Sequence, residues 1–374
     1  MDVTVSKLMK ILLVTDSFNY CCGRSRHIAT LAKYLRIAGH EVSVLCGGGD
    51  GQSLLDGLGV NFIKSALILH QNRSYTRFIL GILKILALLY KHHYDIIHAH
   101  HHYASMMSRP ASILFGVPHV MTIHGAVKKQ GLLSFYSGNY FIAVSHATKL
   151  FAIQEKKSLS HRITSISNGI DLSHSEQNSS IQDIRQIHEI GKNDFIISMI
   201  GRIVPHKGHE VLIKSIAELK STENICVLIV GAGDYLTDLR KMVLAYNIRV
   251  IFTEVVREPT HYYRQSDIIV IPSLCCEGLP MTLLEAGKYS KAVIASRIDG
   301  IAEVIVHNKN GCLVEPNDVM GLKNALLLLI GSRELRESFG EELNKSVRNL
   351  YSAQRMTDET IRVYSQLTAY EVPQ

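Results

Sequence analysis

The sequence predicts an α/β protein with two doubly wound, Rossmann-like domains, each built on a parallel sheet. Short apolar runs rich in β-branched residues alternate with stretches of helical periodicity along most of the chain. A polar segment at 173–194 interrupts this alternation, which then starts again. The length of 374 residues is enough for two domains of about 150 to 200 residues.

The first domain is expected to span residues 1–172. Its predicted strands are KILLVTD at 10–16 and, further on, EVSVLC, DIIHAH, HVMTIHG and YFIAVS. After the first strand, apolar residues recur at the spacing of one helix face, at Ile28, Leu31, Ala32 and Leu35. Gly39 then marks the end of this helix, because glycine commonly follows a helix C-terminus.

The second domain is expected at 195–350, after the linker at 173–194. Its predicted strands, each followed by a helix, are FIISMIG, CVLIVGAG, RVIFTEV, DIIVIPS and AVIASRID. The last segment, 351–374, contains a helix with no strand after it, and we expect this helix to pack back toward the first domain. Ligands of open parallel sheets bind beyond the carboxyl ends of the strands, so the two sheets are expected to face a central cleft.

The charge of the chain is uneven. Residues 1–170 contain 18 Lys and Arg against 7 Asp and Glu, whereas the remainder contains 22 against 26. A basic first half suits an anionic partner such as a phosphate, a lipid headgroup or a nucleic acid, and scattered solvated lysines explain it equally well. We expect no nucleic acid, because basic and aromatic residues do not interleave and the pattern is not that of an RNA-binding module.

The cysteines and the N-terminus favour a cytoplasmic protein. The seven cysteines follow no disulfide framework, which indicates reduced thiols. The N-terminal residues lack the apolar core and the cleavage site of a signal peptide.

The longest apolar run, FILGILKILALLY at 78–90, is interrupted by Lys84 and is shorter than the ~20 residues needed to span a bilayer. Arg73, Arg77 and Lys91 accompany it. This combination suits a peripheral contact with the inner, anionic face of a membrane. Core packing explains the leucines equally well, and both interpretations stay open.

The stretch GRIVPHKG at 201–208 carries two cations beside a predicted helix. Arg202 follows the strand and Lys207 precedes the helix, with a glycine between Lys207 and the helix. A guanidinium, an ammonium and the amides of a helix N-terminus together suit a pyrophosphate.

The stretch EGLPMTLLEAG at 277–287 carries two acids separated by seven residues. A helix starting near Pro280 places Glu285 about one turn in, while Glu277 stays in the preceding loop. The catalytic carboxylates of a retaining glycosidase lie only ~5 to 5.5 Å apart. We therefore interpret the two acids as separate contacts to one elongated ligand, with Glu285 on a ribose and Glu277 on a sugar.

Five motifs in order make the chain resemble glycosyltransferase family 4, whose members are retaining enzymes of the GT-B fold. These motifs are SNGID, GRIVPHKG, EGLPMTLLEAG, DGIAEVI and NGCLVEPND, and the likeness runs from about residue 10 to residue 350. The pair of glutamates is a weak signal alone, whereas the whole series is specific.

The resemblance implies roles for residues of the second domain. Arg202 and Lys207 would hold the diphosphate of a nucleotide-sugar donor, Glu285 its ribose and Glu277 its sugar. The backbone amides of Gly278 and Leu279 would lie near the sugar and the phosphates.

In the first domain, the resemblance implies that His124 faces the donor sugar near the reacting centre. Gly23 matches the second glycine of the family's N-terminal Gly-Gly turn, while Cys22 replaces the first. A cysteine tolerates positive φ poorly, so the substitution puts the backbone path of this loop in question.

The resemblance further implies catalysis without a protein nucleophile, a metal or a cofactor. In such enzymes the leaving phosphate is thought to deprotonate the acceptor on the same face of the sugar. His124, Arg202, Lys207 and Glu277 would then act by hydrogen bonding and by stabilising the charge that develops on the departing diphosphate.

The stretch KHHYDIIHAHHHYAS looks like a metal site because of its histidines. Side chains alternate along a strand, so His98, His100 and His102 are expected on one side and His101 on the other. The run also resembles a histidine-bearing strand end of the family, which needs no metal for transfer. We therefore expect no metal here, and we expect His100 or His102 to line the acceptor side.

The favoured function is sugar transfer from a nucleotide-diphosphate sugar to a glycan or lipid-linked acceptor, in the synthesis of a cell-surface polysaccharide or lipopolysaccharide. Two alternatives remain: a nucleotide-sugar epimerase of the same architecture, and a carbohydrate-binding protein without catalysis. Fold alone does not decide among them.

Overall fold

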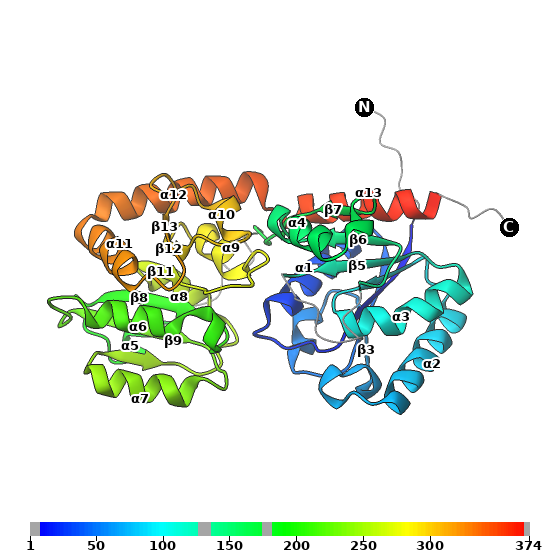
Figure 1. Ribbon diagram of the computed structural model, residues 1–374, viewed down its shortest axis with the longest axis horizontal. Helices are drawn as coiled ribbons and strands as arrows, with labels where there is room; N and C mark the ends of the chain where they lie inside the picture. The colour runs from blue at the N-terminus through cyan, green and yellow to red at the C-terminus, as the bar shows by residue number, and fades with distance from the viewer. Residues whose placement is uncertain (1–7, 126–135, 174–181, 370–374) are drawn as a thin grey trace. The chain divides into compact units, whose positions relative to one another are not determined.

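The computed structural model describes residues 8–125, 136–173 and 182–369. The chain forms two compact units, one of Met1–Gly169 with Ala353–Gln374 and one of Ile170–Ser352. It therefore passes from unit to unit twice. Each unit is a parallel α/β structure, as the alternation of strand and helix patterns predicts (Figure 1).

The first unit contains a seven-stranded parallel sheet in the order β3-β2-β1-β4-β5-β6-β7 within its described residues. Its elements are β1 (Lys10–Thr15), α1 (Gly23–Ile37), β2 (Glu41–Cys46), β3 (Asn61–Lys64), α2 (Tyr75–His92), β4 (Ile96–Ala99), α3 (His102–Phe115), β5 (His119–Ile123), β6 (Tyr140–Ala143), α4 (His146–Glu155), β7 (Ile163–Ser165) and α13 (Ala353–Ala369). The direction of winding reverses between β1 and β4, which lie side by side.

Apolar side chains cover both faces of this sheet, because successive residues of a strand point to opposite sides. Leu12 and Val14 of β1 pack with α2 and α3, whereas Ile11 and Leu13 pack with α1 and α13. Helices accordingly lie on both faces of the sheet (Figure 1). Gly39 takes a φ of +91° two residues after the end of α1, as expected for a helix stop.

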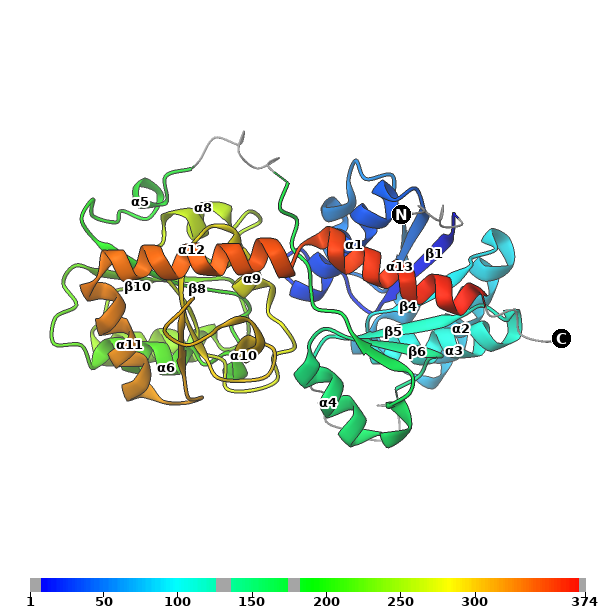
Figure 2. The ribbon, with the colours of Figure 1, turned by 90° about the horizontal axis from the view of Figure 1, so that it is seen from above.

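The C-terminal helix α13 belongs to the first unit, where it lies along α1 (Figure 2). Met356, Val363 and Tyr364 are buried in the core that α1 shares with the sheet. Arg355 adds a hydrogen bond of 2.7 Å to the carbonyl oxygen of Ser167. This burial of apolar side chains explains why the chain returns to the first unit after the second is complete.

The second unit contains a six-stranded parallel sheet in the order β10-β9-β8-β11-β12-β13 within its described residues. Its elements are α5 (Ile184–Ile187), β8 (Phe195–Ile200), α6 (His209–Ala217), β9 (Ile225–Val230), α7 (Leu236–Tyr246), β10 (Val250–Phe252), α8 (Thr260–Gln265), β11 (Ile268–Ile271), α9 (Met281–Lys288), β12 (Ala292–Ser296), α10 (Ile301–Val304), β13 (Cys312–Val314), α11 (Val319–Gly331) and α12 (Arg333–Leu350). Here the winding reverses between the neighbouring strands β8 and β11.

The expected linker at 173–194 is too long at its C-terminal end. Ile184 and Ile190 are buried in a core with Ile196 and Leu228, so this part of the segment belongs to the second unit. These two core isoleucines were missed in the sequence because the rest of the segment is polar. Residues 174–181 lie outside the described residues.

The apolar run at 78–90 forms the greater part of α2. Ile85, Leu88 and Leu89 are buried against the sheet, while Ile79 and Leu83 are exposed. No helix in the described parts of the chain combines the length and the hydropathy needed to cross a membrane.

Candidate functional site

The loops that follow β8 and β11 meet at the point where the winding of the second sheet reverses. The backbone N–H of Leu274 donates to the carbonyl oxygen of His206 at 2.8 Å, and Thr282 Oγ1 donates to the carbonyl oxygen of Ile200 at 3.3 Å. In open α/β sheets, this switch point is where ligands bind. The loops at 201–208 and 272–280 therefore form the candidate site of this unit.

Glycine is required at position 208 for two reasons. Its φ is +76°, and a Cβ there would collide with the carbonyl oxygen of Pro272 in the neighbouring loop. Gly208 is also the N-cap of α6, directly after the short 3₁₀ helix Pro205–Lys207. The close approach of the two loops fixes Lys207 beside the residues that follow β11.

Lys207 and Glu277 form an ion pair across these two loops, with Nζ 2.5 Å from Oε1. Glu277 is 6% exposed, and its Oε1 also accepts a hydrogen bond of 2.6 Å from Ser273 Oγ. The backbone N–H of Glu277 donates to Asp299 Oδ2 at 3.0 Å. Sequence reasoning assigned both ionic residues to one ligand, and the structure brings them into direct contact.

Asp299 follows β12, the next strand of the sheet, and was not foreseen from the sequence. Burial raises the pKa of its carboxyl group, and the nearby charge of Glu277 acts in the same direction. Two carboxylates and one ammonium thus share a small volume, which favours the approach of a further cation or hydrogen-bond donor. The DG dipeptide that follows the strand was the available signal for a residue at this edge.

Arg202 lies on the same loop as Lys207 and is exposed. Its side chain forms no hydrogen bond or ion pair with any residue that the structure describes. A guanidinium without a protein partner, five residues from a half-buried lysine, keeps its donors available for an anion.

Glu285 occupies the fifth position of α9, about one turn in, as predicted. Its Oε2 accepts a hydrogen bond of 2.5 Å from the hydroxyl of Tyr263 on α8. Tyr263 is 1% exposed and stacks on Tyr289. Tyr263 therefore orients the carboxylate, a contact that no local sequence pattern reveals because 22 residues separate the partners.

Gly278 and Leu279 are buried in the loop directly before α9. They lie between Glu277 and the start of that helix, so their backbone follows the edge of the candidate site.

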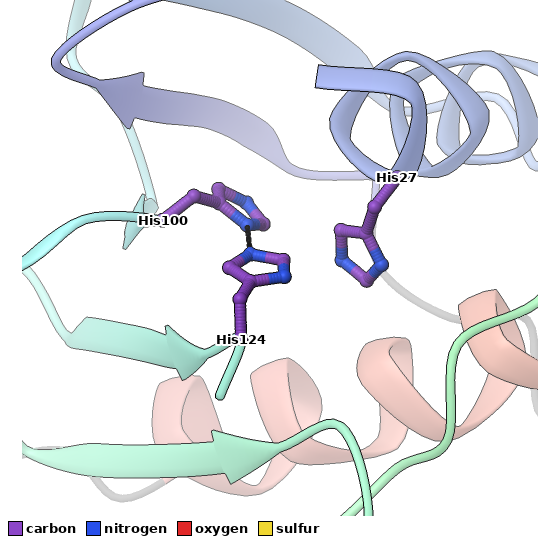
Figure 3. A group of neighbouring side chains, drawn as sticks. All are labelled: His27, His100 and His124. Atoms are coloured by element: carbon purple, nitrogen blue, oxygen red, sulfur yellow. Dashed lines mark hydrogen bonds between the residues drawn. The ribbon is translucent and has the colours of Figure 1, made fainter. Parts of the chain in front are cut away.

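In the first unit, three histidines converge where the winding reverses between β1 and β4. His27 comes from α1, His100 follows β4 and His124 follows β5 (Figure 3). His100 Nδ1 lies 3.2 Å from His124 Nε2, and the ring centroids of His27 and His124 are 4.8 Å apart. The sequence indicated His100 and His124 separately and missed His27, which lies one turn after Gly23 on α1.

The expected alternation of the histidines fails at His102, because β4 ends at Ala99 and α3 begins at His102. The rings of His98 and His100 do lie together, with centroids 4.2 Å apart. The ring of His102 instead contacts His101 and Tyr136. His100 and His102 therefore belong to different groups of side chains.

Burial keeps the three converging imidazoles neutral near pH 7. Desolvation lowers the pKa of His27 to about 4, although Asn168 beside it acts in the opposite direction. Burial, reinforced by neighbouring imidazoles and Arg24, also holds the pKa values of His100 and His124 well below the usual range. Each ring then offers both a donor and an acceptor nitrogen.

Gly23 is exposed and begins α1, and Cys22 precedes it as the N-cap. Cys22 has φ −93° and ψ 124°, which is ordinary extended backbone. The loop therefore needs no glycine at position 22. Cys22 fits there because the backbone does not take a positive φ at this residue.

Two family models match consecutive parts of the chain. The model described as Glycosyltransferase Family 4 matches residues 23–174, and the model described as Glycosyl transferases group 1 matches residues 180–346. Together the two models cover most of the chain, which belongs to the group 1 glycosyltransferases of family 4.

Curated relatives extend over most of the chain. An uncharacterized glycosyltransferase of Methanocaldococcus jannaschii is 27% identical and covers 95% of this chain and 98% of its own. The phosphatidyl-myo-inositol mannosyltransferase of Mycolicibacterium smegmatis is 27% identical over 93% of this chain and 91% of its own. The UDP-Gal:alpha-D-GlcNAc-diphosphoundecaprenol alpha-1,3-galactosyltransferase of Escherichia coli is 26% identical over 76% and 79%.

Solved structures agree on the fold. A glycosyltransferase from Rickettsia africae has a TM-score of 0.83 at 21% identity, covering 97% of this chain and 100% of its own. HepE of Anabaena, in complex with UDP and glucose, has a TM-score of 0.83 at 20% identity, covering 96% and 99%. Together with the two doubly wound units, these likenesses confirm the predicted GT-B fold.

Proposed function

We propose that the protein is a retaining glycosyltransferase that moves a sugar from a nucleotide-diphosphate sugar to a glycan or lipid-linked acceptor, in the synthesis of a cell-surface polysaccharide. The observation that carries this proposal is the Lys207–Glu277 ion pair at the switch point, with the exposed cation Arg202 on the same loop. The relative from Escherichia coli, whose name gives a UDP-sugar and a lipid diphosphate, supports the same donor and acceptor classes.

On the donor side, Arg202 and Lys207 bind the diphosphate and Glu285 accepts hydrogen bonds from the ribose. Lys207 is already held beside Glu277, so phosphate oxygens take up its remaining donors and the carboxylate of Glu277 accepts a hydroxyl of the sugar. The amides of Gly278 and Leu279 line the same ligand, and Gly23 of the first unit stays a candidate for donor binding.

The proposed transfer uses no metal, no cofactor and no protein nucleophile. Cleavage of the sugar–phosphate bond leaves negative charge on the diphosphate, which then accepts the proton of the attacking hydroxyl on the same face. Arg202 and Lys207 stabilise that charge. Removing one such preorganised contact typically raises the activation free energy by about 2.7–4 kcal/mol.

In the first unit, we propose that neutral His124 hydrogen-bonds the donor sugar and that His100 lies on the acceptor side. Their hydrogen bond of 3.2 Å supports joint orientation of the two rings. His102 stays a candidate for the acceptor side, in a separate group with His101 and Tyr136.

The stereochemistry of the product tests the reaction. The purified full-length chain is incubated with UDP-galactose, UDP-glucose or GDP-mannose and a short-chain analogue of GlcNAc-diphosphoundecaprenol, and the new linkage is read by proton NMR. We expect an α-linked product from an α-linked donor. A β-linkage contradicts retention, donor epimerised without acceptor favours the epimerase, and binding without turnover of any donor favours the carbohydrate-binding alternative.

Tyr263→Phe is expected to weaken donor binding about tenfold while changing kcat little. The substitution removes the hydroxyl that donates to Glu285, and a hydrogen bond to a charged group contributes about 1.5–3 kcal/mol. Steady-state kinetics in varied donor concentration measure the change in KM. Tyr262→Phe on the same helix is the matched control, because its hydroxyl contacts His188 instead, and an equal effect of both substitutions would refute the role of Tyr263.

We further propose that the first unit makes peripheral contact with an anionic membrane at the cytoplasmic face. Exposed apolar residues recur along α2 at Tyr75, Ile79 and Leu83, and Tyr90 continues the series. Ile113 and Leu114 at the end of α3, which packs on α2, are also exposed. Together with the basic residues of this segment, they give a surface that suits acidic headgroups and their acyl chains.

The double substitution Ile79→Ser and Leu83→Ser is expected to reduce flotation with vesicles that contain phosphatidylglycerol. Flotation of the unaltered chain is expected to fall at high salt and with phosphatidylcholine alone, because salt screens the attraction to headgroups. Leu244→Ser on α7, where Leu244 is 81% exposed, is the control. Failure of the unaltered chain to float at low salt would contradict membrane contact.

A further inference from the structure

The histidine cluster of His27, His100 and His124 has the spacing of a metal site. One nitrogen from each ring lies within 4.8 Å of the others, and one pair is only 3.2 Å apart. Zn²⁺ binds imidazole nitrogen at about 2.0–2.1 Å, so neighbouring nitrogens of a tetrahedral site lie about 3.4 Å apart. His100 Nδ1 and His124 Nε2, now joined by a hydrogen bond, lie close to this separation, and an ion bound to both would displace the shared proton. His27 faces this pair from α1 (Figure 3).

Several nitrogens of the cluster lack a partner among the described residues. Both ring nitrogens of His27 and the Nε2 of His100 are buried without a hydrogen bond of ordinary geometry, and the two residues are 3% and 1% exposed. Asn168 lies beside His27 and offsets part of the effect of burial on the pKa of its ring. Buried polar atoms nearly always have a partner, and the His27 ring faces the other two rings, so a ligand between them would supply one (Figure 3).

We propose that His27, His100 and His124 bind one divalent transition-metal ion of the Zn²⁺ class, with one coordination position left open. Three imidazoles without a carboxylate suit Zn²⁺, Co²⁺ or Ni²⁺, whereas Mg²⁺ and Ca²⁺ require oxygen ligands. This site contrasts with the expectation from the sequence, which placed no metal here and did not include His27.

The surroundings of the cluster are compatible with a cation. Arg24, one turn before His27, is paired with Asp16 at 2.6 Å, so a carboxylate offsets part of its charge. The His98 ring lies against the His100 ring and is itself held by hydrogen bonds to Tyr364 and Thr122, which restrains the His100 ring. His124 is only partly buried and gives the ion a path to the site.

The bound ion inhibits sugar transfer, because it engages His124 and His100 and withdraws their lone pairs from the substrates. This consequence rests on the proposed function, whereas metal binding does not. The site therefore links the activity to the supply of free transition metal.

Metal binding is tested on the full-length chain after tag removal and treatment with EDTA. Titration with ZnSO₄ against a chromophoric chelator is expected to show one tight equivalent, Co²⁺ to give the absorption of a low-coordinate nitrogen site, and MgCl₂ to show no binding. His27→Gln is expected to weaken Zn²⁺ binding at least about tenfold. His119→Gln is the matched control, since His119 is fully buried in the same unit but outside the cluster.

Thermal unfolding with and without Zn²⁺ verifies that each variant is folded, and His124→Gln replaces His27→Gln if the latter does not fold. Absence of a tight equivalent, or binding by the cluster variants as strong as by the unaltered chain, overturns the proposal. Transfer activity is expected to persist in EDTA and to fall with one equivalent of Zn²⁺. If the chain binds Zn²⁺ but transfers no sugar, the metal site is supported and the proposed function is refuted.

Discussion

Lys207→Ala is expected to lower kcat at least about a hundredfold, because one preorganised contact to the charge of a transition state contributes about 2.7–4 kcal/mol. Lys207 is held by Glu277 at 2.5 Å, so its ammonium is in place before a donor arrives. Steady-state kinetics with the donor identified by screening measure kcat and KM separately. A large fall in kcat, beyond any rise in KM, indicates a contact that is stronger in the transition state.

The control for this substitution has to separate chemistry from stability. Removing Lys207 leaves the buried carboxylate of Glu277 without its cation, which destabilises the fold. The double variant Lys207→Ala with Glu277→Gln removes that unpaired charge, and we expect it to regain thermal stability without regaining activity. Lys214→Ala on α6, where the Lys214 side chain is 41% exposed and pairs with Glu210, is expected to keep normal kinetics. Near-normal turnover of Lys207→Ala would contradict the assignment.

Arg202→Ala is expected to produce a similar loss of kcat with no loss of stability. The Arg202 side chain is exposed and bonds to no residue within the described ranges, so its removal takes nothing from the folded chain. Surface substitutions of this kind usually change stability by less than about 0.5 kcal/mol. Parallel measurements of kcat and of the thermal midpoint therefore distinguish Arg202 from Lys207.

Arg202→Lys adds a graded test of the same residue. A lysine retains the charge but not the planar fork that binds two phosphate oxygens, so intermediate activity is expected. Arg333→Ala on α12, where the Arg333 side chain is 82% exposed, serves as the matched control for loss of a surface arginine. Equal kinetics of Arg202→Ala and Arg333→Ala would refute a role for Arg202 in donor binding.

Much of the fold could be predicted because its signals are local. Strand β1 and helix α1 are recognised from an apolar run, helical spacing and a terminal glycine within a span of 30 residues. The extent of the linker could not be read in this way. Ile184 and Ile190 become core residues only through contacts with β8 and β9, which a scan of neighbouring residues does not contain.

The candidate site shows the same limit. The sequence placed Lys207 and Glu277 on one ligand by motif, but their direct contact depends on β8 and β11 being neighbours across 70 residues. His102 was misplaced because the strand ends at Ala99, three residues earlier than the alternation assumed. His27 was missed because a lone histidine within an amphipathic helix carries no signal until the sheet brings His100 and His124 beside it.

Calorimetric titration of the full-length chain with UDP-, GDP- and ADP-sugars tests the central claim most directly, namely that the loops after β8 and β11 bind a nucleotide-diphosphate sugar. The account predicts one-to-one binding of at least one of these donors, abolished in a variant that combines Arg202→Ala with Lys207→Ala. The claim would be contradicted if no donor gave a heat of binding at millimolar concentration, or if the double variant bound the donor as well as the unaltered chain does.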